Sequence, residues 1–160
     1  MKKFFVEYFS WLFLFIFAFL VFSSYLIGDG NNFWGYRFFL VQSGSMEPTI
    51  MTGDVIVVKS QTDYKVRDVA TFKDSSNHII THRVTEIKNG VFVTKGDANR
   101  TTDNGNIQFN QIIGKVIFIL PKLGFLVVFS KSIPGLIIFM VIPGIYIIVS
   151  EILKNGKKSE

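Results

Sequence analysis

Hydrophobic residues fill both ends of the chain, whereas its middle alternates between apolar and polar positions. The first apolar run extends from Phe4 to Ile27 and is interrupted by Glu7 and a few small polar residues. A helix needs about 20 mostly apolar residues to cross the hydrocarbon core of a bilayer. A cleavable signal peptide would have a shorter core and end in a small-x-small site, which residues 27–32 do not offer. We therefore expect an uncleaved transmembrane anchor over residues 4–27.

Between residues 33 and 120 the pattern has a period of two and is broken by turn residues, which is typical of β strands. The dipeptide Asn89-Gly90 separates two alternating runs and is a strong hairpin signal, because both turn positions need a positive φ angle. The pattern predicts about seven short strands with no convincing helix, and so a compact, mainly β domain over residues 33–120. The clearest expected strands cover residues 55–59, 68–73, 79–88, 91–94 and 112–120.

The second apolar end begins at residue 121. Residues 133–150 contain no charge and are followed by Glu151 and a group of lysines. We expect residues 121–132 to form a membrane-proximal apolar segment and residues 133–153 to form a C-terminal transmembrane helix, kinked at Pro143. The pattern leaves open whether residues 125–129 enter the membrane or close the β domain.

The charges divide unevenly along the chain. Ten Lys/Arg and nine Asp/Glu lie between Asp29 and Leu120, while seven Lys/Arg and three Asp/Glu lie in or beside the apolar ends. A nucleic-acid-binding domain would carry a basic patch on its folded part, so no nucleic-acid partner is expected. Lysines mark the cytoplasmic flanks of membrane spans. We therefore predict a multi-pass protein of the cell membrane, with both termini cytoplasmic and the β domain on the outer, extracytoplasmic face.

The chain has no cysteine and only two histidines. Disulfides, thiolate metal sites and cysteine nucleophiles are thereby excluded, and a His-rich metal site is not expected. We predict neither a metal nor a cofactor. The aromatic-rich stretch 33–39 is expected to rest on the membrane surface or to cover a face of the sheet, and the two roles are compatible.

A short polar bend follows the apolar segment 38–41. It reads Ser43-Gly44-Ser45-Met46-Glu47-Pro48-Thr49. The proline fixes its own φ angle and pushes the residue before it towards extended geometry, so a helix cannot continue through the bend. Two hydroxyls, those of Ser43 and Ser45, on a rigid bend suggest a nucleophile with a helper, although Ser, Gly and Pro also mark ordinary turns.

A serine hydroxyl needs a base within hydrogen-bond reach, and the histidines and lysines are the candidates. His82 falls among apolar neighbours on one face of the expected strand 79–88, whereas His78 falls in the polar turn before it. The residues expected on the His82 face are Ile80, His82, Val84 and Glu86. A histidine on such a face is often structural, so its residue type alone leaves both roles open.

Two aspartates, Asp97 and Asp103, belong to the polar loop that follows the predicted hairpin. A carboxylate that accepts a hydrogen bond from imidazole Nδ1–H fixes the tautomer and stabilises the imidazolium. Either aspartate could serve in this way, and loop aspartates also commonly cap turns.

Five short motifs occur in an order that resembles the type I signal peptidases, peptidase family S26. They are Ser-Gly-Ser-Met-Glu-Pro-Thr at 43–49, Gly-Asp-Val-Ile at 53–56, Asp-Val-Ala-Thr-Phe at 68–72, Thr-His-Arg-Val at 81–84 and Lys-Gly-Asp-Ala-Asn at 95–99. The histidine at position 82 stands where the ordinary bacterial branch carries a lysine. The chain is therefore similar to the endoplasmic-reticulum-type, Ser-His branch, whose fold is a β domain carried on a transmembrane helix.

The resemblance implies a role for each candidate residue. Ser45 would be the nucleophile, His82 the general base and Asp103 the third member. Asp97 would support the site, and the Ser43 hydroxyl would contribute to the oxyanion hole. Which aspartate contacts the imidazole is left open.

The resemblance further implies a membrane-bound serine endopeptidase that removes signal peptides from secreted precursor proteins, cleaving after small residues through an acyl-enzyme. The expected partners are precursors with signal peptides and the lipid bilayer, and the pattern does not decide whether partner subunits are needed. A catalytically inactive, membrane-tethered binding module on the same fold is one alternative. A Ser-Lys peptidase that uses Lys73 or Lys95 is another.

Overall fold

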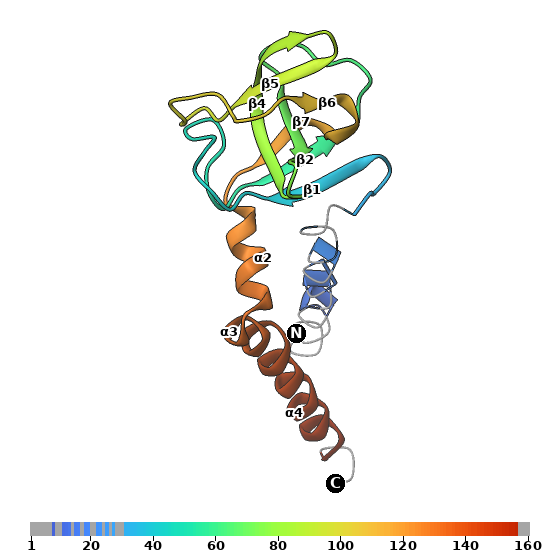
Figure 1. Ribbon diagram of the computed structural model, residues 1–160. Helices are drawn as coiled ribbons and strands as arrows, with labels where there is room; N and C mark the ends of the chain where they lie inside the picture. Colours follow the sequence, from blue (N-terminus) through green and yellow to red (C-terminus); the bar gives the residue numbers. More distant parts are fainter. Residues whose placement is uncertain are drawn as a thin grey trace. The chain divides into compact units, whose positions relative to one another are not determined.

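The computed structural model describes residues 31–156 and scattered positions between residues 8 and 27 (Figure 1). The expected anchor over residues 4–27 lies largely outside the described residues and stays a prediction. The chain divides into two compact units, of which one runs from Leu26 to Phe125 and the other comprises the two ends of the chain.

The Leu26–Phe125 unit is built on one antiparallel sheet, which confirms the expected mainly β class. Seven strands in the described part pair in the order β1-β2-β7-β3-β4-β5-β6 (Figure 1). Their bounds are β1 Tyr36–Leu40, β2 Val55–Lys59, β3 Val69–Lys73, β4 Ile79–Lys88, β5 Val91–Lys95, β6 Ile107–Gln108 and β7 Ile112–Leu120, with a 3₁₀ turn, η1, at Phe109–Gln111. Because β7 returns to lie between β2 and β3, it joins the first strands of the domain to the later ones.

The β4–β5 connection is the hairpin that the sequence predicts. Asn89 has a φ angle of 49° and Gly90 one of 78°, and the strands on either side pair directly from Lys88 opposite Val91. Both turn residues adopt the left-handed conformation that a two-residue hairpin loop requires.

A β-bulge changes the expected alternation along β4. The register with β5 shifts between Val84 and Glu86, so Ile87 rather than Glu86 packs against the buried cluster of this half of the sheet. His82 and Val84 are buried as expected, but the assignment of Glu86 to their face is wrong. A bulge inserts one residue and so reverses the side-chain alternation beyond it.

Two apolar clusters form the core of the domain. The first consists of Phe39, Met46, Ile50, Ile56, Val58 and Ile113. The second consists of Tyr64, Ala70, Phe72, Val84, Phe92 and Ile107. Two members of the first cluster, Met46 and Ile50, come from the polar bend and its end, so the core itself holds that bend in place.

The chain leaves the domain through a helix. Helix α2 (Leu123–Lys131) begins against the turn at Gly53, where the Gly124 N–H donates to the Gly53 carbonyl oxygen at 3.0 Å. A Cβ at Gly53 would collide with the ring of Phe125. The beginning of the 125–129 segment therefore packs on the β domain.

The remaining described helices are α3 (Ile133–Leu136), a π-helical turn η2 (Ile137–Val141) and α4 (Ile142–Gly156). The π-helical turn comes just before Pro143, which has no N–H to continue the ladder. None of the described helices is by itself long and apolar enough to cross a membrane, whereas Leu123–Lys131 and Ile133–Val149, bent by 83° between them, pass together by length and composition. The span predicted over residues 133–153 stays a prediction.

Candidate active site

The loop between β1 and β2 presents Ser45 half-buried at the surface of the domain. The next residue, Met46, is 2% exposed, and Ile50 is 1% exposed. The Ile50 N–H donates to the Met46 carbonyl oxygen at 3.0 Å, and the Glu47 N–H donates to the Gly44 carbonyl oxygen at 3.0 Å. Two buried side chains and two turn hydrogen bonds thus fix the backbone on which the Ser45 hydroxyl is carried.

His82 lies on the buried face of β4 and faces this hydroxyl. Its Nε2 is 3.1 Å from Ser45 Oγ, and the residue is 6% exposed. Across the strand pair it lies opposite Ala70, whose small side chain leaves room for the ring. The ring of Phe72 packs edge-on, with centroids 6.4 Å apart. The imidazole is therefore held by packing, with one nitrogen directed at the serine.

The other imidazole nitrogen is in contact with Asp103. His82 Nδ1 lies 2.6 Å from Asp103 Oδ2. Of the two aspartates that the sequence left open, Asp103 is the one in contact with the imidazole, and its role stays a prediction. The Asp103 N–H donates to the Thr94 carbonyl oxygen at 2.9 Å, and the Thr94 hydroxyl donates to Asp103 Oδ2 at 2.6 Å. No motif in the sequence points to Thr94, although a polar residue two positions after the apolar Phe92, on the buried face of β5, is a signal for it.

Asp97 is bound by a different partner, the residue after His82. Arg83 donates from Nε to Asp97 Oδ1 at 2.8 Å and from a terminal nitrogen to Asp97 Oδ2 at 2.6 Å. Thr49 of the serine loop also donates to Asp97 Oδ2, at 2.6 Å. The hydrogen bonds from Arg83 lower the pKa of the Asp97 carboxyl below its ordinary value, and the hydrogen bond from Thr49 lowers it further. Together they outweigh burial, which raises the pKa. Asp97 thus links the serine loop to β4.

The turn after β5 also touches the serine residue itself. The Ala98 N–H donates to the Ser45 carbonyl oxygen at 2.9 Å. A Cβ on Gly96 would lie 2.6 Å from that carbonyl oxygen and 2.7 Å from Asn99 Nδ2. Only a glycine permits so close an approach, which explains why Gly precedes Asp97 in this loop.

Ser43 lies beside the same hydroxyl and is exposed. Its Oγ is 3.5 Å from Ser45 Oγ, which is long for an O–H···O hydrogen bond. Among the described residues, its hydroxyl has no shorter side-chain contact.

The contacts form one line, from a hydroxyl through an imidazole to a carboxylate. A base within reach of the hydroxyl and an acceptor behind the base is the arrangement that activates serine for acyl transfer. Lys73 and Lys95 make no contact with Ser45 among the described residues, whereas His82 Nε2 does. The part of the chain that the structure describes contains no cluster of three or more His, Cys, Asp or Glu placed to hold a metal ion.

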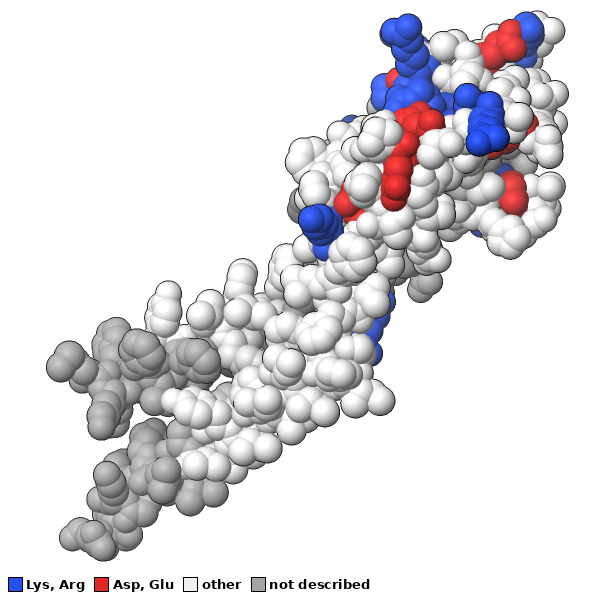
Figure 2. Space-filling view, turned by 90° about the vertical axis from the view of Figure 1, so that its left-hand side faces the viewer, with Lys and Arg blue, Asp and Glu red and all other residues white. Residues whose placement is uncertain are grey.

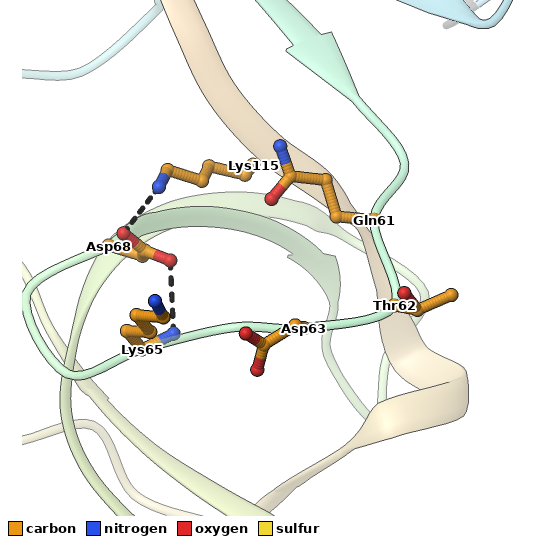
Figure 3. A pocket seen from close by; sticks show the side chains of 6 residues that line it. All are labelled: Gln61, Thr62, Asp63, Lys65, Asp68 and Lys115. Atoms are coloured by element: carbon orange, nitrogen blue, oxygen red, sulfur yellow. Dashed lines mark hydrogen bonds and ion pairs between the residues drawn. The ribbon is translucent and has the colours of Figure 1, made fainter.

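A separate hollow of about 400 Å³ lies beside the β2–β3 loop (Figure 3). Its lining is Gln61, Thr62, Asp63, Lys65, Asp68 and Lys115. Lys115 reaches Asp68 at 2.6 Å. Burial raises the pKa of the Asp68 carboxyl, but the hydrogen bonds from Lys115 and from the Lys65 N–H outweigh it, and the pKa is lowered. The charges of Lys115 and Asp68 pair with each other, and none of the lining residues belongs to the serine site.

Comparison with known proteins finds similarity to peptidases. The model of the family described as Peptidase S24-like matches residues 32–117. Signal peptidase I W of Bacillus subtilis is 40% identical over 95 residues, covering 55% of this chain and 50% of the relative. The signal peptidase complex catalytic subunit SEC11 of Scheffersomyces stipitis is 28% identical over 136 residues, 76% of this chain and 80% of the relative.

The human signal peptidase complex catalytic subunit SEC11C is 30% identical over 110 residues, 59% of this chain and 57% of the relative. The chain thus spans about half the length of Signal peptidase I W and of SEC11C. These relatives confirm the resemblance to type I signal peptidases that the ordered motifs indicated.

Proposed function

The chain belongs to the Peptidase S24-like family, and we propose that it is a membrane-bound serine endopeptidase that removes signal peptides from secreted precursor proteins. One observation carries the proposal: Ser45 Oγ, the His82 ring and Asp103 Oδ2 lie in a continuous line of contacts at 3.1 and 2.6 Å. The names of the relatives supply the substrate class, since they are signal peptidases.

The chemistry follows from the order of the three groups. His82 Nε2 takes the proton of Ser45 as Oγ attacks the carbonyl carbon of the scissile peptide. His82 then gives this proton to the leaving amine, which becomes the mature N-terminus, and the acyl-enzyme is left on Ser45. A water molecule, deprotonated by the same imidazole, hydrolyses the ester. Asp103 keeps the Nδ1–H tautomer throughout and stabilises the imidazolium.

The developing oxyanion needs donors of its own. The Ser45 N–H and the Ser43 hydroxyl are the groups that we propose for it, because both lie beside the attacking oxygen. One such donor contributes roughly 3–4 kcal/mol to transition-state stabilisation in acyl transfer. The exposure of Ser43 suits this role, since its hydroxyl has to be accessible to the substrate oxygen.

An open sheet edge beside His82 supports entry of the substrate as an extended strand. β3 pairs with β4 from Ile79 to Arg83, but the pairing of β5 with β4 starts at Arg83. The stretch from Ile79 to His82 therefore has one strand neighbour among the described residues, and the substrate backbone can add on its other side. This edge ends at the catalytic imidazole, where the scissile bond must lie.

The membrane setting is part of the proposal. We propose spans over residues 4–27 and 133–153, both termini in the cytoplasm, and the catalytic domain of residues 33–120 on the outer face. Large apolar side chains such as Ile133 and Ile148, which are 76% and 61% exposed, support a lipid environment for the C-terminal helices. On the face in Figure 2, charged side chains gather over the β domain. Two of the relatives are named as subunits of a complex. The cleavage test described next also shows whether this chain needs partner subunits.

The test is cleavage of a secreted precursor co-expressed with the full chain. We expect the precursor to be processed by the wild type and to accumulate uncut with Ser45→Ala and with His82→Ala. His78→Ala, which changes the exposed second histidine, and Ser75→Ala, in an exposed turn, are the matched controls and should process normally. Mass spectrometry of the new amino termini identifies the bond that is cut.

The two alternatives predict different outcomes. An inactive binding module leaves the precursor uncut by every variant, the wild type included. A Ser-Lys peptidase stays active with His82→Ala and loses activity with Lys73→Ala or Lys95→Ala. Either result would overturn the Ser-His mechanism.

A further inference from the structure

Thr94 is buried directly behind the serine site. It lies in β5 and is 1% exposed. Its hydroxyl donates to Asp103 Oδ2 at 2.6 Å, and this is the same oxygen that lies 2.6 Å from His82 Nδ1. One carboxylate oxygen is therefore shared between the imidazole and a threonine hydroxyl.

A hydroxyl at this buried, apolar position is explained by its hydrogen bond to Asp103. Thr94 is paired with Val84 across the sheet, and Val84 and Phe92 belong to the same apolar cluster. Valine has the shape of threonine and suits a buried strand position better, because it brings no polar group to desolvate. In the part of the chain that the structure describes, the hydrogen bond that offsets the cost of burying this hydroxyl is the one to the Asp103 carboxylate.

Among the described residues, the Asp103 side chain is hydrogen-bonded to His82 and Thr94. It lies in the polar loop between β5 and β6, and its side chain is 21% exposed. Thr94 holds it at two points, since the Thr94 carbonyl oxygen accepts from the Asp103 N–H at 2.9 Å and the Thr94 hydroxyl donates to the carboxylate. A carboxylate on a loop rotates freely about its last torsion, and the second contact fixes that rotation.

We propose that Thr94 is a positioning residue for the catalytic machinery: its hydroxyl sets the rotation of the Asp103 carboxylate so that Oδ2 receives His82 Nδ1–H. This inference rests on the function proposed above. A carboxylate that is ionised has no proton to give, so the hydroxyl is the donor. Loss of the donor leaves the imidazole with a partner that samples other rotations, and the fraction of molecules with a correctly oriented base falls.

The chain contains a matched control for the loss of a buried hydroxyl. Thr71 in β3 is fully buried, and its Oγ1 lies 2.8 Å from Thr81 Oγ1. Neither of these hydroxyls contacts Asp103. Thr71→Val removes a buried threonine hydroxyl from the same sheet, as Thr94→Val does, but leaves the carboxylate untouched.

The first measurement is the kinetics of peptide cleavage by the purified full chain in detergent micelles, with thermal unfolding recorded beside it. For Thr94→Val we expect kcat to fall about 10–100-fold, as it does when a residue that hydrogen-bonds to a metal ligand is removed from a metalloenzyme. KM should stay within about twofold, because Thr94 does not contact the substrate. Thr94→Ser, which keeps the donor, should recover most of kcat. Thr71→Val should lose a similar amount of thermal stability and keep kcat.

The second measurement does not depend on turnover. In a His78→Ala background, where His82 is the remaining histidine, the low-field proton NMR signal of the imidazole Nδ1–H reports the hydrogen bond to Asp103. We expect this signal in the parent and in Thr94→Ser, and its loss or broadening in Thr94→Val. Equal kcat in Thr94→Val and Thr71→Val, an unchanged signal in Thr94→Val, or failure of Thr94→Ser to restore either readout would overturn the inference. A parent that cleaves nothing but shows the same NMR pattern would contradict the proposed function and leave the positioning role supported.

Discussion

Ser45 Oγ is in contact with a residue 37 positions away in the chain, His82. A free serine hydroxyl is a weak nucleophile at neutral pH, and the proposed base lies on β4, an inner strand of the sheet. What makes the pairing possible is the buried Met46, which fixes the backbone next to the serine, and the small Ala70, which leaves space for the imidazole. The contact between Ser45 and His82 is thus positioned by apolar residues that have no proposed role in catalysis.

The first prediction concerns Asp103. In Asp103→Asn the side chain keeps its shape, but its amide presents either a donor to Nδ1 or an uncharged oxygen, so the imidazole is no longer held in the tautomer that accepts the serine proton. We expect kcat to fall by about 10⁴-fold, the effect of this substitution in a Ser-His-Asp site, while the thermal unfolding temperature changes little. Peptide cleavage and thermal unfolding of the purified variant measure the two quantities.

The control for this substitution is Asp63→Asn, at an exposed position of the β2–β3 loop. It should be as active as the wild type. An Asp103→Asn variant that retained more than a tenth of the wild-type kcat would show that the carboxylate does not orient the base.

The second prediction concerns Gly96. A Cβ at this position would meet the Ser45 carbonyl oxygen at 2.6 Å, and backbone cannot move aside as a flexible side chain can. Gly96→Ala should therefore push the turn after β5 away from the serine, destabilise the domain by about 1–3 kcal/mol, the usual cost of overpacking, and lower kcat at least tenfold. Gly144→Ala is the control, because nothing lies within 4 Å of its Cβ position. Wild-type activity in Gly96→Ala would contradict the close approach.

At the scale of the elements, the Asp97 carboxylate joins the loop after β5 to β4 and to the serine loop. It accepts two hydrogen bonds from Arg83 and one from Thr49. Hydrogen bonds to a charged group contribute about 1.5–3 kcal/mol, and here three elements depend on the same group. These contacts hold the loop of Ser45 against the strand of His82 without involving Ser45 Oγ or His82 Nε2.

The third prediction is the pH dependence of this link. The pKa of Asp97 is lowered in the folded chain, first by Arg83, so the unfolded chain binds its proton more readily. Its contribution to stability is therefore complete above the ordinary aspartate pKa near 4 and is lost as the pH falls through the lower, folded value. We expect Asp97→Asn to reduce the free energy of unfolding by about 1–3 kcal/mol at pH 7. The difference from the wild type should shrink below about pH 4.

Chemical denaturation of both proteins at a series of pH values measures this difference. Thr49→Val, which removes one of the three hydrogen bonds, should show a smaller loss at pH 7. A constant difference between Asp97→Asn and the wild type down to pH 2 would mean that Asp97 does not act through its charge.

Local features of the fold could be predicted from the sequence, and features set by the register between paired strands could not. The hairpin at Asn89-Gly90 follows from two residues, because their φ preferences suffice. The bulge after Val84 depends on how β5 pairs with β4, and no residue type at this position predicts it.

The same distinction applies to the site. Ser45 and His82 were candidates from their own chemistry and from ordered motifs. The choice of Asp103 rather than Asp97 as the neighbour of the imidazole depends on where a long polar loop returns to the sheet. Arg83, one residue after His82, is hydrogen-bonded to Asp97, and Thr94 is hydrogen-bonded to Asp103. These are pairings between distant residues, which periodicity does not encode.

For the whole molecule, the proposal requires the β domain to lie on the outer side of a membrane. The charge pattern supports this, since the domain is nearly balanced while lysines gather beside the apolar ends. A signal peptide emerges from the membrane on the side away from the cytoplasm, so a domain on the cytoplasmic side could not meet the bond that it is proposed to cut.

The last prediction tests this placement, and the chain is suited to it because it contains no cysteine. A single cysteine introduced by Ser75→Cys lies in an exposed turn between β3 and β4, and one introduced by Ser159→Cys lies in the lysine-flanked C-terminal tail. In intact cells, a membrane-impermeant maleimide should label the Ser75→Cys protein and spare the Ser159→Cys protein. After permeabilisation both should be labelled, which controls for reactivity. Both variants should still process a precursor, because neither substitution changes a residue proposed to take part in catalysis. Labelling of Ser159→Cys but not Ser75→Cys in intact cells would invert the topology and remove the substrate from reach. Labelling of both would mean that the C-terminal apolar segment does not carry the chain back across the membrane, while the catalytic domain would still face the emerging precursor.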